Sequence, residues 1–391
     1  MKTFATRRRR RFFDLVANAD WVLVTAAAGL SMLGAFMVWS ATRGSLADSG
    51  LNPEQYFSRH LMNMAIGMVL GFVLSRFDYR MLRAYTPVIY GLSLVGLVAV
   101  LTPLGTTVNG AQNWIPLGFG FTVQPSEFTK VALVTALAFL LADKAHHADA
   151  ETPPSNRDIL LVLVVMAVPL LLILLEPDLG TVIVIGITVI SVVAVSGATT
   201  GWVLGMMAAV VVVGTLAVSP VTPLQRYQLA RITCFTNPQA GTRSDCFQQI
   251  QSQVAVGAGS FTGQGLFHGE QTQGRFVSFN YTDFVFSVVG EELGFLGSLL
   301  VVALLSIVIW RGVVIARQAQ DLFGRLVATG VVCWFAFQAF ENIGMNLGIM
   351  PITGVPLPFM SYGGSSMFAC WLGVGLLVNV HTATRQSVRR A

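Results

Sequence analysis

The chain has 391 residues, of which 54% are hydrophobic and 11% are charged, and its mean hydropathy is +0.68. A soluble domain of this size cannot expose so many apolar side chains to water, so the composition excludes a soluble globular protein. The formal net charge of +5 and the pI of about 9.2 come from basic residues that flank apolar runs. That distribution is typical of membrane orientation, and we expect no nucleic-acid partner.

Apolar runs of roughly 15 to 22 residues recur along the chain. About 20 helical residues cross a hydrocarbon core roughly 30 Å thick, whereas membrane strands show only about ten residues of alternating polarity. The predicted fold class is therefore all-α, a polytopic integral membrane helical bundle with about ten transmembrane helices. The predicted spans are 21–41, 61–75, 84–104, 125–142, 159–175, 181–197, 202–220, 292–310, 326–342 and 364–380.

The first apolar run follows five arginines at 7–11, an arrangement that also occurs in signal peptides. This run is too long for a signal peptide, and Trp39 and Arg43 stand where a small-residue cleavage site is expected. We therefore predict a retained helix. The arginine cluster is most simply a topology anchor beside anionic lipid.

The basic residues also predict an orientation. With both termini in the cytoplasm, the inner segments hold 17 of the 24 lysines and arginines and the outer segments hold six, while Lys130 falls within a span. The positive-inside rule favours this topology over its inverse. We expect a bacterial cytoplasmic-membrane protein whose active face is extracytoplasmic.

We predict one membrane domain over residues 1–391, since no segment resembles a separate soluble domain. It comprises a basic cytoplasmic tail at 1–20, a large extracytoplasmic loop at 221–282 between the seventh and eighth spans, and a cytoplasmic tail at 381–391. A loop of that length is seldom a mere connection. Its amphipathic piece at 250–256 and its many glycines predict short interfacial helices and turns.

Two shorter outer segments, 104–124 and 345–363, are rich in turn-forming residues, and function is expected on this face. Cys234 and Cys246 share the large outer loop, where an oxidising compartment could pair them in a disulfide. The other two cysteines lie in apolar runs, where packing is their simplest role.

Ionisable groups at membrane depth are costly, so each is a functional candidate. Glu127 and Lys130 stand three residues apart, which places both on one face of the fourth span. They suit a helix-locking ion pair as well as a direct role in catalysis. For Glu176 and Asp178, capping of the next helix near Thr181 is favoured over chemistry. The remaining candidates are Asp283, Glu291, Glu292 and Glu341.

Arg226 and Arg231 lie in the large outer loop, where a guanidinium group could bind substrate phosphate or a lipid headgroup. The sequence has no Walker loop, no dinucleotide-binding glycine motif, no CxxC and no HExxH. The five histidines form no metal-binding pattern, and we assign no metal site.

Six strings in this chain resemble the SEDS family of shape, elongation, division and sporulation proteins. They run in the family's order and cover the chain from the first span to the last. The final string is more similar to the family's elongation member than to its division member. The strings are NGAQNW (109–114), QPSEFTK (124–130), EPDLGT (176–181), QSQVAVGAGSFTGQG (251–265), YTDFVFSVVGEELGFLG (281–297) and PITGVPLPFMSYGGSS (351–366).

The resemblance implies a peptidoglycan glycosyltransferase that polymerises lipid II outside the cytoplasmic membrane and works with a class B penicillin-binding protein. It places the family's essential aspartate at Asp283 and its paired acidic and basic residues at Glu127 and Lys130. Within the matching strings, the other expected substrate-binding residues are Gln251, Ser252, Ser361 and Tyr362.

Two departures from the family pattern stand out. The chain has Asn113 where the family often has arginine before tryptophan, which puts an anion contact there in doubt. It also has Tyr281 and the three preceding residues, SFN, where the family often has Pro-Glu-x-His. A histidine neighbour of Asp283 is therefore missing.

The expected chemistry joins a sugar hydroxyl to an anomeric carbon, with inversion, as a lipid pyrophosphate leaves. That step needs a base near the acceptor and positive charge near the leaving group. Asp283 is the candidate base, and Lys130, Arg226 and Arg231 are candidates for the pyrophosphate. The sequence requires no cofactor, although a divalent cation, Mg²⁺ or Mn²⁺, could assist without permanent protein ligands.

Two other functions remain as alternatives. A lipid II flippase or another transporter would place polar groups near the midplane and often show inverted repeats, both weak here. A non-catalytic scaffold of a wall-synthesis complex would need no buried charge.

Overall fold

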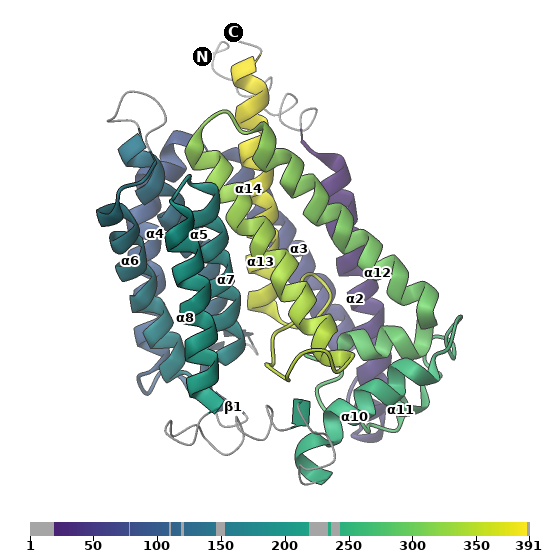
Figure 1. Ribbon diagram of the computed structural model, residues 1–391. Coiled ribbons are helices and arrows are strands. Elements are labelled where there is room, and N and C mark those ends of the chain that lie inside the picture. Colours follow the sequence, from purple (N-terminus) through teal and green to yellow (C-terminus); the bar gives the residue numbers. More distant parts are fainter. Residues whose placement is uncertain are drawn as a thin grey trace, which may run out of the picture.

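The computed structural model describes residues 19–77, 79–108, 111–118, 121–145, 153–218, 234–235 and 243–388. The ten apolar runs predicted from the sequence all form helices, gathered in one bundle (Figure 1). These helices are α2 (Trp21–Asp48), α3 (Gln55–Arg76), α4 (Tyr79–Val100), α5 (Pro125–Ala145), α6 (Asn156–Leu175), α7 (Leu179–Val195), α8 (Thr200–Val218), α12 (Val285–Gln318), α13 (Leu322–Asn346) and α14 (Gly364–Val388).

Eight of the described helices are long and apolar enough to cross a membrane, and the apolar parts of α7 and α8 are shorter. The protein is thus a multi-pass membrane protein, as the composition predicts. Helix α13 lies at the centre, against α5, α7, α12 and α14. Its Trp334 and Phe335 are buried, whereas Leu92 of α4 and Leu171 of α6 are more than 60% exposed. In a membrane protein such exposed apolar side chains face lipid.

Helix α2 begins and α14 ends at the same end of the bundle (Figure 1). There, Asp20 caps α2 by accepting the Leu23 amide at 3.1 Å, and its Oδ2 accepts from the Nε of Arg311 in α12 at 2.9 Å. The Asn379 side chain of α14 donates to the carbonyl of Phe77 at 2.9 Å and to that of Leu74 at 3.1 Å. The Asn379 side chain thus pairs with backbone carbonyls at the end of α3, where intrahelical donors are lacking or limited.

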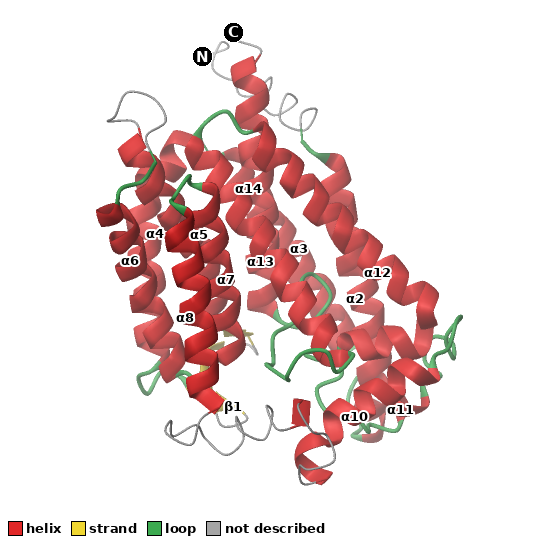
Figure 2. Ribbon diagram, in the orientation of Figure 1, coloured by secondary structure: helices red, strands yellow, loops and turns green. Residues whose placement is uncertain are grey.

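The opposite end carries the strands and most of the irregular structure, including elements that the sequence did not predict (Figure 2). Segment 104–124 folds into a three-stranded antiparallel sheet in the order β1 (Thr106–Val108), β2 (Ala111–Gly118) and β3 (Phe121–Val123). Within the predicted large loop lie α10 (Arg243–Ala258) and α11 (Glu270–Gln273), in agreement with the expected short helices.

Helix α12 begins seven residues before the predicted boundary of 292, because Glu291 and Glu292 are both buried within it. Glu291 accepts the backbone amides of Gln271 and Thr272 at 2.6 and 2.9 Å, so it caps α11. The helix kinks at Gly294, whose φ of +64° disfavours any side chain.

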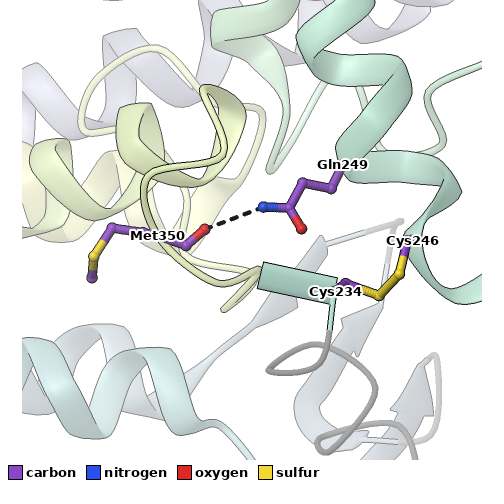
Figure 3. Close-up of a disulfide and its surroundings, with 4 residues drawn as sticks. All are labelled: Cys234, Cys246, Gln249 and Met350. Carbon is purple, nitrogen blue, oxygen red and sulfur yellow. Dashed lines mark hydrogen bonds between the residues drawn. A yellow bond between two sulfur atoms is a disulfide. The ribbon is translucent and has the colours of Figure 1, made fainter. Parts of the chain in front are cut away.

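The predicted disulfide between Cys234 and Cys246 is present, with the two Cα atoms 5.2 Å apart (Figure 3). It joins residue 234 to α10. From α10, Gln249 also reaches the carbonyl of Met350 at 3.5 Å (Figure 3). This contact places α10 beside the connection between α13 and α14.

Candidate functional site

A cavity of about 440 Å³ opens at the irregular end of the bundle. Its walls come from the first turns of α3 and α5, the sheet, the turn between α6 and α7, the residues before α12 and the connection 347–363. The polar side chains that line it include Arg59, Asn113, Gln124, Glu127, Asp178 and Asp283. Five of the six family strings thus contribute residues to this cavity.

Asp283 is half-buried in this cavity, two residues before α12 begins. Its backbone amide donates to the carbonyl of Phe279 at 3.1 Å. Its own carbonyl accepts from the side-chain amides of Asn342, at 2.7 Å, and Asn346, at 3.2 Å. A Cβ atom at Gly354 would lie 3.6 Å from the Asp283 carboxylate, and Gly354 has a φ of +79°. The carboxylate is therefore placed against a bare stretch of backbone.

The amides that hold Asp283 belong to a ladder on one face of α13, formed by Gln338, Asn342 and Asn346 at intervals of four residues. Asn342 also donates to the Val355 carbonyl at 2.8 Å, and Gln338 donates to the Pro356 carbonyl at 2.8 Å. The ladder thus binds both the Asp283 segment and the cavity wall. Sequence reasoning missed it, although three amides spaced by four in an apolar helix are an available signal.

The predicted pair of Glu127 and Lys130 is confirmed, with the ammonium and carboxylate 2.7 Å apart and both side chains 2% exposed. Lys130 also donates to the Gln338 side-chain oxygen at 2.9 Å and lies 5.0 Å from the ring centroid of Trp334. Glu127 lines the cavity, whereas Lys130 is directed beneath it into the helix packing. This geometry favours an ion pair that supports the cavity floor, and direct substrate binding by Lys130 stays a prediction.

Arg59, one of the six basic residues of the predicted outer segments, is half-buried in α3. Of the described residues that line the cavity, it is the only one with a basic side chain. The Arg59 guanidinium lies beside the Tyr362 hydroxyl, and its charge opposes the rise that burial causes in the Tyr362 pKa. A cation is therefore available in the same cavity as Asp283.

Three tyrosines from distant segments meet at the cavity. The Tyr56 ring centroid lies 5.3 Å from that of Tyr281 and 4.8 Å from that of Tyr362. Burial, assisted by Tyr56, Tyr362 and the Asp283 charge, raises the pKa of Tyr281 to about 12. The Tyr281 phenol therefore stays protonated at neutral pH and can donate a hydrogen bond.

Asp178 caps α7 as predicted: it accepts the Thr181 amide at 3.0 Å and the Thr181 hydroxyl at 2.8 Å. Glu176 does not cap α7. It lies buried in the turn between α6 and α7, and its two oxygens have no hydrogen-bond partner among the described residues. Burial, and then the nearby Asp178 charge, raise the pKa of Glu176 to about 8.

The remaining residues predicted to bind substrate are Gln251, Ser252, Ser361 and Tyr362, and three of them form hydrogen bonds within the protein. The Ser361 hydroxyl donates to the Thr282 carbonyl at 2.5 Å, and the Tyr362 amide donates to the Tyr281 carbonyl at 2.9 Å, so both fasten the connection 347–363 to the Asp283 segment. Tyr362 also lines the cavity, whereas Gln251 and Ser252 do not. Ser252, which lies in α10, instead donates a hydrogen bond to Asn346 of α13.

Arg226 and Arg231 lie outside the described residues, and so do most of the loop 221–282 before α10 and the tail before residue 19. Within the described ranges, no three His, Cys, Asp or Glu side chains gather closely enough to hold a metal ion.

A family model described as cell cycle protein, FtsW/RodA/SpoVE, matches residues 20–386. The chain belongs to this family. It is 36% identical to a probable peptidoglycan glycosyltransferase FtsW of Trichlorobacter lovleyi over 93% of each chain, and 34% identical to the peptidoglycan glycosyltransferase MrdB of Escherichia coli strain K12 over 96% of each.

A solved structure described as a peptidoglycan synthase complex that coordinates polymerization and crosslinking contains a similar chain. The TM-score is 0.76 and the identity 31%, over 94% of this chain and 99% of that one. The sequence-based preference for the elongation member, RodA, over the division member, FtsW, stays a prediction, because relatives named FtsW and MrdB match to a similar degree.

Proposed function

We propose that this protein is a peptidoglycan glycosyltransferase that polymerises lipid II into glycan strands for cell elongation, with inversion and with Asp283 as the general base. Family membership and the names of the relatives support the glycosyltransferase activity. The observation that carries the site is the position of Asp283, whose carboxylate lines the same cavity as Arg59 and the cluster of Tyr56, Tyr281 and Tyr362.

In this reaction the carboxylate of Asp283 accepts the proton from the 4-hydroxyl of the acceptor sugar. The hydroxyl oxygen attacks the anomeric carbon of the lipid-linked donor, and the bond from that carbon to the pyrophosphate oxygen breaks with the electron pair on the leaving group. A base must lie within hydrogen-bond reach of the proton that it removes. The hydrogen bonds from Asn342 and Asn346 fix the Asp283 backbone, and Gly354 leaves space beside the carboxylate.

The departing pyrophosphate needs a cation, and a planar guanidinium can bind phosphate through two hydrogen bonds. Arg59 is the candidate that the cavity offers, in addition to Arg226, Arg231 and Lys130. Because Lys130 is already paired with Glu127, its charge is largely balanced. Any divalent cation would arrive with the substrate pyrophosphate, since the described residues offer no cluster of ligands.

We place the cavity on the extracytoplasmic face and both termini in the cytoplasm. The excess of basic residues on the other side of the bundle supports this orientation. A class B penicillin-binding protein is the proposed partner, because a similar chain belongs to a peptidoglycan synthase complex. The membrane lipid and the lipid-linked glycan complete the set of interacting molecules.

The decisive experiment compares Asp283→Asn with the wild type in polymerisation of purified lipid II, with and without the partner. The variant keeps the size of the side chain but loses its basicity, and a positioned general base typically supplies about 10² to 10⁴ in rate. We expect polymerisation to fall by that factor while thermal stability stays unchanged. Glu54→Gln is the matched control, because Glu54 is an exposed carboxylate at the same end and does not line the cavity.

A folded Asp283→Asn protein that polymerises at the wild-type rate would disprove the base assignment. An assay of lipid II movement across vesicle membranes distinguishes the flippase alternative from polymerisation. A wild-type protein that moves lipid II but never joins two molecules of it would favour transport.

A further inference from the structure

A second cavity of about 240 Å³ lies directly against the first, and no part of the proposed chemistry uses it. The two cavities share Tyr56, Phe279 and Tyr281, which therefore form the wall between them. On the far side of this wall, the polar residues of the second cavity come from α2 and from the segment before Asp283. They are Thr42, Ser45, Arg275, Ser278 and Asn280.

The dividing segment is held in a strained conformation. Arg275 and Phe279 both have a φ of +58°, which is unfavourable for side chains with a Cβ atom. The Phe279 carbonyl accepts the amides of Thr282, Asp283 and Phe284, at 3.1 to 3.2 Å. Residues in such conformations cluster at ligand-binding and catalytic sites, where the surrounding structure maintains the strain. The wall of the second cavity and the position of Asp283 are thus determined by one turn.

The charge and chemistry of the second cavity differ from those of the first. Its Arg275 forms an ion pair with Asp48, so the basic side chain is compensated. The remaining polar groups are hydroxyls and one buried amide, Asn280, next to aromatic rings. Hydroxyls, amides and apolar ring faces suit an uncharged ligand with many hydroxyl groups, and a phosphate would find no uncompensated cation among the described lining residues.

We propose that the second cavity is a subsite for a sugar unit of the glycan strand, one unit beyond the sugars that react at Asp283. This inference rests on the proposed function. Only the two sugars that are being joined can lie at the base, so the rest of a growing strand must leave the first cavity. Tyr56 and Tyr281 border both cavities, so a strand that leaves the first cavity over these side chains reaches the second cavity next. The cavity is below the usual range of about 300 to 1,000 Å³ for drug-sized ligands, as expected for one sugar unit.

The experiment fills this subsite and measures strand length. Ser45→Trp places a large side chain in the second cavity from α2, whereas Ala47→Trp, the matched control, places the same side chain at an exposed position of α2 outside both cavities. Purified full-length protein is given lipid II, and the lipid-linked tetrasaccharide from the first coupling is quantified separately from longer strands. We expect Ser45→Trp to raise the ratio of tetrasaccharide to long strands several-fold, with no change in Ala47→Trp.

A second measurement does not depend on turnover or on a bulky substitution. Asn280→Ala, with its thermal stability checked against the wild type, is titrated with a lipid-free tetrasaccharide released from the polymer and, separately, with inorganic pyrophosphate. We expect weaker binding of the tetrasaccharide and unchanged binding of pyrophosphate. Unchanged strand lengths in Ser45→Trp, or a loss of pyrophosphate binding alone in Asn280→Ala, would overturn the sugar subsite. A wild-type protein that forms no tetrasaccharide would instead refute the proposed function itself.

Discussion

The side-chain amide of Asn342 donates at 2.7 Å to the backbone carbonyl of Asp283 and at 2.8 Å to that of Val355. One residue in the middle of a buried helix therefore joins the segment that carries the proposed base to the connection that forms the opposite wall. Because Asn342 is completely buried, water cannot replace either hydrogen bond.

We expect Asn342→Leu to lower the turnover number for lipid II more than it changes KM. Leucine has a similar size but removes the donor to the Val355 carbonyl and leaves the Asp283 carbonyl with the weaker hydrogen bond from Asn346 at 3.2 Å. A buried carbonyl without a donor costs roughly 1 to 3 kcal/mol. Steady-state polymerisation and thermal unfolding in detergent measure the two effects. Asn379→Leu is the control, since it removes comparable carbonyl contacts at the other end of the bundle. An equal loss of turnover in Asn342→Leu and Asn379→Leu would show that Asn342 contributes only to general stability.

The buried pair of Glu127 and Lys130 predicts a strong coupling in a double-mutant cycle. Glu127→Gln or Lys130→Met alone leaves a buried charge without its partner, which costs about 3 to 5 kcal/mol. The double variant removes both charges, and we expect it to regain much of the lost stability and, with it, activity. Thermal unfolding of the wild type, the two single variants and the double variant gives the coupling free energy between the two side chains. Full stability but no activity in the double variant would show that the charges act on the substrate.

The sequence allowed the bundle to be predicted, because long apolar runs signal membrane helices without any knowledge of tertiary contacts. It did not allow the start of α12 to be predicted. Glu291 and Glu292 resemble a water-exposed boundary in the sequence, yet they are buried because Glu291 caps α11 and Ser40 donates to Glu292 at 2.5 Å. The small sheet was also missed, since its three short strands pair only with each other.

Asp283 and Glu127 could be selected from the sequence because charged residues at membrane depth are costly and because they fall in family strings. Arg59 could not, since an arginine at the edge of a span equally marks topology. The tyrosine cluster joins residues 56, 281 and 362, and no local pattern relates such distant positions. The packing of α3 against α14 brings Tyr56 and Tyr362 together, and the hydrogen bond from the Tyr362 amide to the Tyr281 carbonyl adds Tyr281.

Glu176 predicts a specific dependence of stability on pH. Its pKa is raised from 4.5 to about 8, so the folded protein keeps the proton that the unfolded chain releases near pH 4.5. The unfolded state binds fewer protons between these values, and stability therefore falls as pH rises from about 4.5 to about 8. Glu176→Gln should remove this contribution.

Thermal unfolding midpoints at pH 5.5 and pH 8.5 test this prediction. We expect the midpoint of the wild type to fall further between the two values than that of Glu176→Gln. The control is again Glu54→Gln, an exposed glutamate whose loss should leave the wild-type profile unchanged. Parallel profiles for the wild type and Glu176→Gln would show that Glu176 is ionised in the folded protein.

The last prediction concerns the face of the membrane on which the cavity opens. Glu270 in α11 and Arg157 in α6 are both exposed and lie at opposite ends of the bundle, so each can carry a single reporter cysteine. The background is Cys333→Ser with Cys370→Ala, which removes both free thiols and keeps the disulfide. An impermeant thiol reagent added to intact cells should modify the cysteine at 270, whereas the one at 157 should react only after permeabilisation. The reverse pattern would place Asp283 in the cytoplasm, where a strand made for the outer wall could not be released, and would thus contradict the proposed reaction as well as the topology.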